Sequence, residues 1–173
     1  VTMVASIGCM ATSSPNREVR PMVPTHTAVY MSWDELRSTA VQVKAPQPIR
    51  QRGKLLIVGE HLFLSEPGGG VHVFDNADPR HPRALMFIEI PGNIDIAVRD
   101  DLLYADSFVD LLVFELDLPK RTARLVERLE DQFEYNPYQV LTSDSQVMLD
   151  SIDQKRGVVI RLEPKNNSAE VAQ

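Results

Sequence analysis

The chain has 173 residues, of which 43% are hydrophobic and 24% are charged, as is ordinary for a globular domain. Its formal net charge of −6 argues against a nucleic-acid partner, because phosphates require a basic protein face. No stretch reaches the ~20 apolar residues of a membrane-spanning helix. The single cysteine excludes an internal disulfide and a zinc cluster built on cysteines.

The cysteine stands at position 9, after a short apolar stretch and before a polar, proline-containing segment that runs to about Pro24. The sequence Ala5–Cys9 resembles the lipobox of bacterial lipoproteins, in which the cysteine becomes the acylated first residue. Ser6 departs from this pattern, since leucine is usual there, and no basic residue precedes the apolar stretch. We therefore expect residues 1–29 to be a signal-like segment with lipidation at Cys9, followed by a disordered tether. The alternative is a free cysteine in a disordered tail.

Residues 30–50 are predicted to form a short helix and a lead-in strand. Ser32 and Glu35 have the spacing of a capping box, and Trp33 and Leu36 supply an apolar contact. The helix ends near Ala40, because residues 41–43 alternate like a strand and prolines follow. We expect the helix to have a structural role, covering an edge of the sheets that follow.

The rest of the chain repeats a unit of four short strands about every forty residues. Leu62-Phe63 recurs 41 positions later as Leu103-Tyr104, and Val73-Phe74 recurs 40 positions later as Val113-Phe114. The first unit is predicted to have strands at 54–58, 61–65, 71–75 and 84–90, and the second at 94–98, 102–105, 111–116 and 122–129. Such a period is typical of β-propeller blades.

A third unit is incomplete, with strands predicted at 140–141, 146–149 and 157–162 and none after them. The fold prediction is all-β: a partial β-propeller of about two and three-quarter four-stranded antiparallel blades, with one short N-terminal helix. We assign 51–163 to the incomplete propeller and 164–173 to a polar tail. Propellers typically close with four to eight blades, so we expect a piece of a longer protein or a truncated gene product. Uncovered apolar side chains at its two ends should make the isolated chain self-associate; these are Leu55, Ile57, Val147, Val159 and Ile160.

Three segments resemble a known family: Gly53–Phe63, Val73–Pro82 and Ile90–Phe114. They are similar to the blades of bacterial LVIVD-repeat proteins, and Tyr30–Arg37 resembles the segment that precedes the first blade of that family. The resemblance implies a β-propeller lipoprotein of the bacterial cell envelope, lipid-anchored on the periplasmic or outer-membrane side. It carries over no catalytic residues.

Sequence motifs give little support for an enzyme or a cofactor. The histidines lack the spacing of a zinc helix motif, and we interpret all four, His72 included, as surface or edge residues. The segment Pro67–Gly70 is a hairpin, because it lacks the lysine of a phosphate-binding loop. Residues 75–78 are more simply an Asx turn than a calcium loop.

Loops after the second and fourth strands of each unit should emerge at one end of a meander. This end collects the candidate ligand- or cation-binding residues Glu66, Asn93, Asp95, Asp106, Asp110 and Asp150. Clustered carboxylates in loops could hold a cation or a basic ligand. The alternative is that Asp and Asn are there for turn chemistry alone. The opposite end collects basic residues, diluted by Asp78, Asp100 and Asp101.

Two functions remain on this reading. The favoured one is a non-enzymatic binding or scaffold module, with a protein or small-molecule ligand at a propeller loop face and a membrane contact through the lipid anchor. The alternative is a propeller-type hydrolase or dehydrogenase whose catalytic residues lie in blades that this chain lacks.

Overall fold

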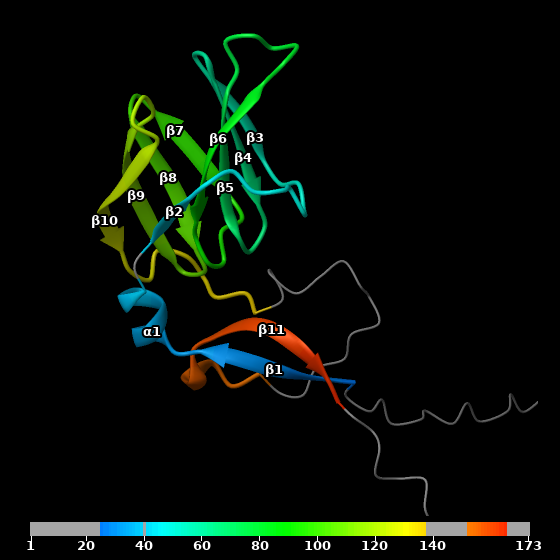
Figure 1. Cartoon of the computed structure of the whole chain (residues 1–173). Coiled ribbons are helices and arrows are strands. Elements are labelled where there is room, and N and C mark those ends of the chain that lie inside the picture. Colours follow the sequence, from blue (N-terminus) through cyan, green and yellow to red (C-terminus); the bar gives the residue numbers. More distant parts are fainter. Residues whose placement is uncertain (1–24, 40, 138–151, 166–173) are drawn as a thin grey trace, which may run out of the picture.

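The structure is a computed structural model that describes residues 25–39, 41–137 and 152–165. These residues form antiparallel sheets with one short α-helix and one 3-10 turn, so the all-β prediction is confirmed (Figure 1). The elements in chain order are β1 (His26–Met31), α1 (Trp33–Ser38), β2 (Gln42–Lys44), β3 (Leu55–Val58), β4 (His61–Glu66), β5 (Gly70–Asp75), β6 (Arg83–Glu89), β7 (Ile96–Arg99), β8 (Leu102–Ser107), β9 (Asp110–Asp117), β10 (Thr122–Leu129), η1 (Gln154–Arg156) and β11 (Val158–Pro164).

Two sheets contain the predicted repeat units. The first sheet has the strand order β2-β6-β5-β4-β3, and the second has the order β10-β9-β8-β7. Within each, the four strands of a unit follow one another as a meander, as the turn signals predicted. The lead-in strand β2 pairs with β6 and gives the first sheet a fifth strand.

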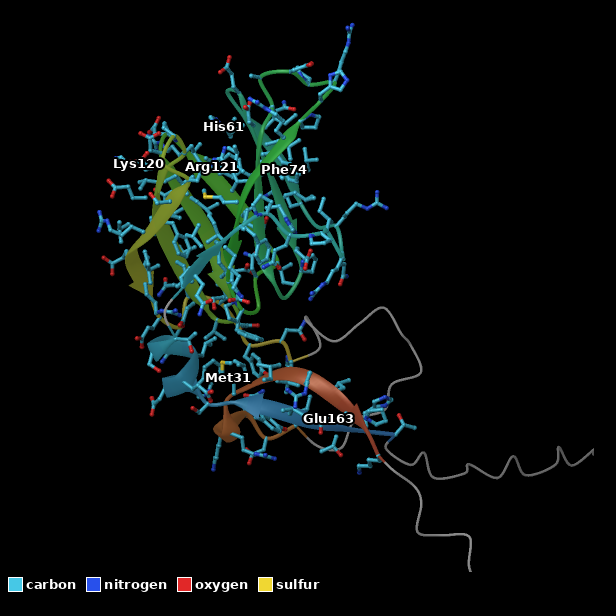
Figure 2. All side chains as sticks on the ribbon, viewed as in Figure 1. Met31, His61, Phe74, Lys120, Arg121 and Glu163 are labelled. Carbon is cyan, nitrogen blue, oxygen red and sulfur yellow. The ribbon has the colours of Figure 1, made fainter. Side chains whose placement is uncertain are left out.

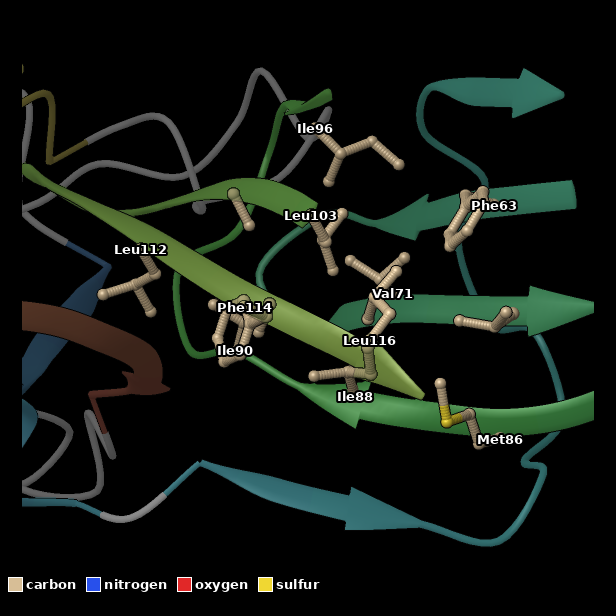
Figure 3. Packing of buried hydrophobic residues seen from close by; sticks show 12 residues of the cluster. Phe63, Val71, Met86, Ile88, Ile90, Ile96, Leu103, Leu112, Phe114 and Leu116 are labelled. Atoms are coloured by element: carbon tan, nitrogen blue, oxygen red, sulfur yellow. The ribbon is translucent and has the colours of Figure 1, made fainter. Parts of the chain in front are cut away.

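The two sheets pack on a common apolar core, because each strand presents alternate side chains to the space between them (Figure 3). On β9, for example, Leu112, Phe114 and Leu116 are buried, whereas Leu111 and Val113 on the opposite face are only half-buried. The core comprises Phe63, Val71, Val73, Met86, Ile88 and Ile90 from the first unit and Ile96, Leu103, Ala105, Leu112, Phe114 and Leu116 from the second.

The repeat extends to individual hydrogen bonds between the first and second strands of each unit. In the first unit, Ser65 Oγ accepts from the amide of Lys54 at 2.8 Å. Forty-one positions later, Asp106 Oδ1 accepts from the amide of Asp95 at 3.0 Å. In both units, a side chain at the end of the second strand therefore binds the backbone amide just before the first strand.

The third sheet differs from the predicted third unit. The strand predicted at 157–162 is β11, and it pairs with β1 from the other end of the described chain. Residues 26–29 thus belong to a strand, which pairs with a strand more than 130 residues away in the sequence. The predicted tether, which included these residues, therefore extends too far. The remaining predicted strands at 140–141 and 146–149, together with Val147 and Cys9, lie outside the described residues.

Helix α1 follows β1 in the chain and packs between the third sheet and the second. Ser32 Oγ accepts from the amide of Glu35 at 3.2 Å, which confirms the predicted N-cap. Leu36, only 2% exposed, packs with Phe108 and Val158. The helix is therefore a structural element between sheets, as predicted.

The prediction of exposed apolar side chains at both ends of the stack is correct only for the end formed by the first sheet. Leu55 and Ile57 on β3 are 53% and 60% exposed. Val159 is buried at 1% exposure, and its amide donates to Tyr135 Oη at 2.8 Å; Ile160 is half-buried. The prediction was wrong for Val159, because β11 packs within the third sheet and against residues after β10.

Candidate functional site

The meander gives the two stacked sheets two ends, each formed by turns. The lower end, nearer to α1, carries the β4–β5, β6–β7 and β8–β9 connections; the upper end carries the β3–β4, β5–β6, β7–β8 and β9–β10 connections (Figures 1 and 2). The described members of the predicted site belong to the lower end, namely Glu66, Asn93, Asp95, Asp106 and Asp110. Asp150 lies outside the described residues.

At the lower end, Asp106 and Asn93 hold the connection between the two sheets. Asp106 Oδ1 accepts from the amide of Ile94 at 2.7 Å and from Asn93 Nδ2 at 2.9 Å, in addition to the Asp95 amide. Burial raises the pKa of Asp106 above its usual value, and these hydrogen bonds offset only part of that effect. Asn93 is fully buried. Both side chains therefore bind backbone and one another.

Asp110 is fully buried at the start of β9 and joins α1 to the second sheet. Its carboxylate accepts from Arg37 Nη2 at 3.0 Å, from Arg128 Nη1 at 2.8 Å and from the amide of Asp131 at 3.1 Å. Burial raises the pKa of Asp110, but the hydrogen bonds with Arg37, Asp131 and Arg128 outweigh burial and hold that pKa below its usual value. The Asp110 carboxylate is therefore part of an internal ion-pair network.

Glu66 is paired with His72, a residue that was predicted to lie at the surface or at a sheet edge. His72 is 3% exposed, and its Nε2 lies 2.9 Å from Glu66 Oε2. Its ring packs against Phe87, with centroids 4.6 Å apart. Burial raises the pKa of Glu66, but the Arg50 amide and His72 outweigh burial and lower it. The interpretation of His72 as a surface or edge residue was wrong, because β5 lies in the middle of the sheet.

Asp95, the remaining member, binds Lys54 Nζ at 2.7 Å and the amide of Ile96 at 2.8 Å. Among the described residues, no group of three or more histidine, cysteine, aspartate or glutamate side chains is arranged to hold a metal ion. Each described carboxylate of the predicted site thus has a structural partner. The lower end favours the turn-chemistry alternative over a cation site.

A cleft of about 810 Å³ opens instead at the upper end, between the two sheets. Its apolar lining includes Val58 and Phe63 from the first unit and Val98, Leu116 and Leu118 from the second. Its polar lining consists of His61, Asp100, Asp101, Glu115, Asp117, Thr122 and Arg124. A concave site with an apolar lining and a few polar groups is the usual form of a small-molecule site.

The cleft is acidic. Arg124 pairs with Glu115, and Asp117 pairs with Lys120 Nζ at 2.6 Å, a contact that lowers the pKa of Asp117. Asp101 receives a hydrogen bond only through its backbone oxygen, from the amide of Leu116 at 2.8 Å, among the contacts of the described residues. Four carboxylates and one guanidinium line the cleft. The arrangement suits a cationic group that carries an apolar segment.

Sequence reasoning did not find this cleft. It noted Asp100 and Asp101 only as acidic exceptions at a basic end, because the strands supplying the apolar lining are far apart in the chain. The available signal was that Glu115 and Asp117 lie just before the β9–β10 turn, which emerges at the same end of the meander as Asp100-Asp101. Comparison of the chain with models of protein families, with curated proteins and with solved structures found no match.

Proposed function

We propose that this protein is a non-enzymatic binding module of the LVIVD-repeat β-propeller type, attached to the bacterial cell envelope. The observation that supports this best is the repetition of one four-stranded meander in two stacked sheets. Their first strands, β3 and β7, lie beside one another, as do the inner strands of neighbouring propeller blades. The matched hydrogen bonds at Ser65 and Asp106 also support a true repeat.

We place the ligand in the upper cleft. The lower-end carboxylates are held by internal hydrogen bonds, whereas the cleft offers volume, an apolar lining and exposed carboxylates in one place. The ligand class that fits is a small molecule or peptide segment with a cationic group beside an aliphatic or aromatic part. The carboxylates attract the cation, and the apolar lining binds the rest of the ligand.

Matched eight-carbon amphiphiles test this assignment. The isotope-labelled protein is titrated with octylammonium, octanol and octanoate while backbone amide shifts are recorded. Octylammonium should give saturable shifts at residues 98–101 and 116–118, octanol weaker ones, and octanoate the weakest. Replacing Asp101 by asparagine should weaken octylammonium binding by about fivefold, the effect of about 1 kcal/mol from one nearby charge.

Glu134→Gln is the matched control, because it removes an exposed carboxylate that does not line the cleft. This variant should bind octylammonium as the wild type does. Equal affinity for all three amphiphiles, or shifts spread over the whole chain, would contradict a cationic site in the cleft.

We also propose that Cys9 carries the lipid anchor. The support is the lipobox-like sequence Ala5–Cys9. As a separate finding, none of the helices in the described ranges could span a membrane. Expressed from its native precursor in a bacterium, the wild type should sediment with membranes and Cys9→Ala should be released into the periplasmic fraction. A multiply acylated cysteine should hold the protein on the membrane, because stable attachment takes more than one acyl chain. Equal recovery of both proteins in the soluble fraction would therefore rule out this anchor.

A further inference from the structure

The interface between the two sheets is made of two different faces. The forward face of the first sheet, defined by Leu56, Phe63, Val71, Val73 and Ile88, belongs to the core between the sheets. The rear face of the second sheet meets it and is defined by Ile96, Leu103, Ala105, Leu112 and Phe114. The contact is therefore heterologous: one kind of face binds the other.

The repeat puts a second copy of each face on the outside of the stack. Forty or 41 positions after the residues of the first forward face lie Ala97, Tyr104, Leu111 and Val113 of the second sheet. Leu129 completes this free forward face, because it pairs with Leu111 as Ile88 pairs with Val71. The same offsets, counted backward from the second rear face, give a free rear face on the first sheet: Leu55, Leu62, Leu64, His72 and Phe74.

Parts of both free faces are exposed where their counterparts are buried, although Leu64 and His72 of the free rear face are themselves buried, at 7% and 3% exposure. Leu129 is 42% exposed, whereas the equivalent Ile88 is fully buried. Leu55 is 53% exposed, whereas the equivalent Ile96 is 2% exposed. A groove of about 420 Å³ runs over the free forward face, between Tyr104, Leu111 and Phe133. One chain thus carries both halves of an interface that it already forms once internally.

We propose that the free forward face of one copy binds the free rear face of a second copy, head to tail. The occupant is a second copy because its free rear face is the repeat equivalent of the rear face that binds a forward face in the internal interface. Within the described part of the chain, the two sheets pack through unlike faces and not through two faces of the same kind. Head-to-tail contacts close into a ring or extend as an open chain, and they differ in this from the symmetric contact of a two-fold dimer.

Two substitutions separate this arrangement from other kinds of association. Leu55→Glu places a charge on the free rear face, and Leu129→Glu places one on the free forward face. Both sites are exposed at the surface of the single chain, so each variant should fold, which far-UV circular dichroism checks. Each substitution alone should weaken association by about 30-fold or more, because the equivalent Ile96 and Ile88 are buried in the internal interface and a charge at such a position loses its water.

The decisive measurement is sedimentation of the two variants mixed. Leu55→Glu keeps its forward face and Leu129→Glu keeps its rear face, so the mixture should form a one-to-one dimer and stop there. The wild type should continue to larger rings or chains. Leu125→Glu is the matched control, since it lies on the same strand, is 37% exposed and pairs with Phe114 on the other face of the sheet.

A wild type that remains a monomer overturns the proposal, because the two faces are then covered within the chain or do not bind. A mixture that stays monomeric while the wild type associates also overturns it. The inference rests on the stacked repeat of the proposed function but not on the ligand, so it can fail while octylammonium still binds the cleft.

Discussion

Replacing Asp110 by alanine should lower the free energy of unfolding by about 3 kcal/mol, the loss expected when one partner of a buried ion pair is removed. The carboxylate is fully buried and binds Arg37, Arg128 and the amide of Asp131. Its loss leaves two guanidinium groups, 23% and 13% exposed, without their shared acceptor. Helix α1 should also be held less firmly to the second sheet, although Arg37 keeps Glu130 and Asp131 as partners. Urea denaturation measures the change.

The effect should depend on pH in a defined direction. The pKa of Asp110 is lower in the folded state than the value of about 3.9 for an unfolded aspartate. Its contribution to stability is thus fully present above that unfolded value and is lost as the pH falls through the folded pKa. The difference between wild type and Asp110→Ala should accordingly shrink in acid.

Glu115→Ala is the control for this experiment. Glu115 also pairs with an arginine, but its side chain is 54% exposed, so its removal should cost less than about 1 kcal/mol. If the two variants lose the same stability at neutral pH, Asp110 does not hold the helix in the way that its contacts indicate.

Gly70→Ala is the second substitution with a large expected effect. Gly70 has a φ of 143°, and a Cβ there would lie 2.0 Å from the carbonyl oxygen of Ile88, on the neighbouring strand β6. The backbone conformation alone costs of order 1–3 kcal/mol for a residue with a side chain. The contact with backbone adds to this, because β5 and β6 must separate locally. The loss should be visible as a lower urea midpoint.

Gly59→Ala provides the comparison, since it isolates the backbone effect. Gly59 has a φ of 56°, and a Cβ there would meet nothing within 4 Å. Its substitution should cost about 1–2 kcal/mol, the usual penalty of the left-handed conformation. Equal losses at the two positions would mean that the first sheet relaxes around a side chain at Gly70.

Strand positions could be predicted from the sequence because alternation and turn residues are local signals. The strand predicted at 122–129 matches β10 residue for residue, and the predicted capping at Ser32 is present. The repeat also determined the strand order, since consecutive strands joined by short turns pair with one another.

Partners far apart in the sequence could not be predicted in this way. Nothing local indicates that His26–Met31 pairs with Val158–Pro164, or that Arg37 binds Asp110 across 73 positions. The surroundings of the predicted loop-face residues could not be predicted for the same reason. Their carboxylates were assigned to the correct end of the meander, but the backbone amides and arginines that bind them come from other segments.

The pairing of β1 with β11 brings the two ends of the described chain together. The amide of Lys165 donates to the carbonyl oxygen of Thr25 at 2.9 Å, so these residues are one hydrogen bond apart. A linker of a few residues would span this gap without moving either strand. The chain could then be opened at the exposed turn of residues 76–82 instead, and a circularly permuted protein would keep every strand pair of the described structure.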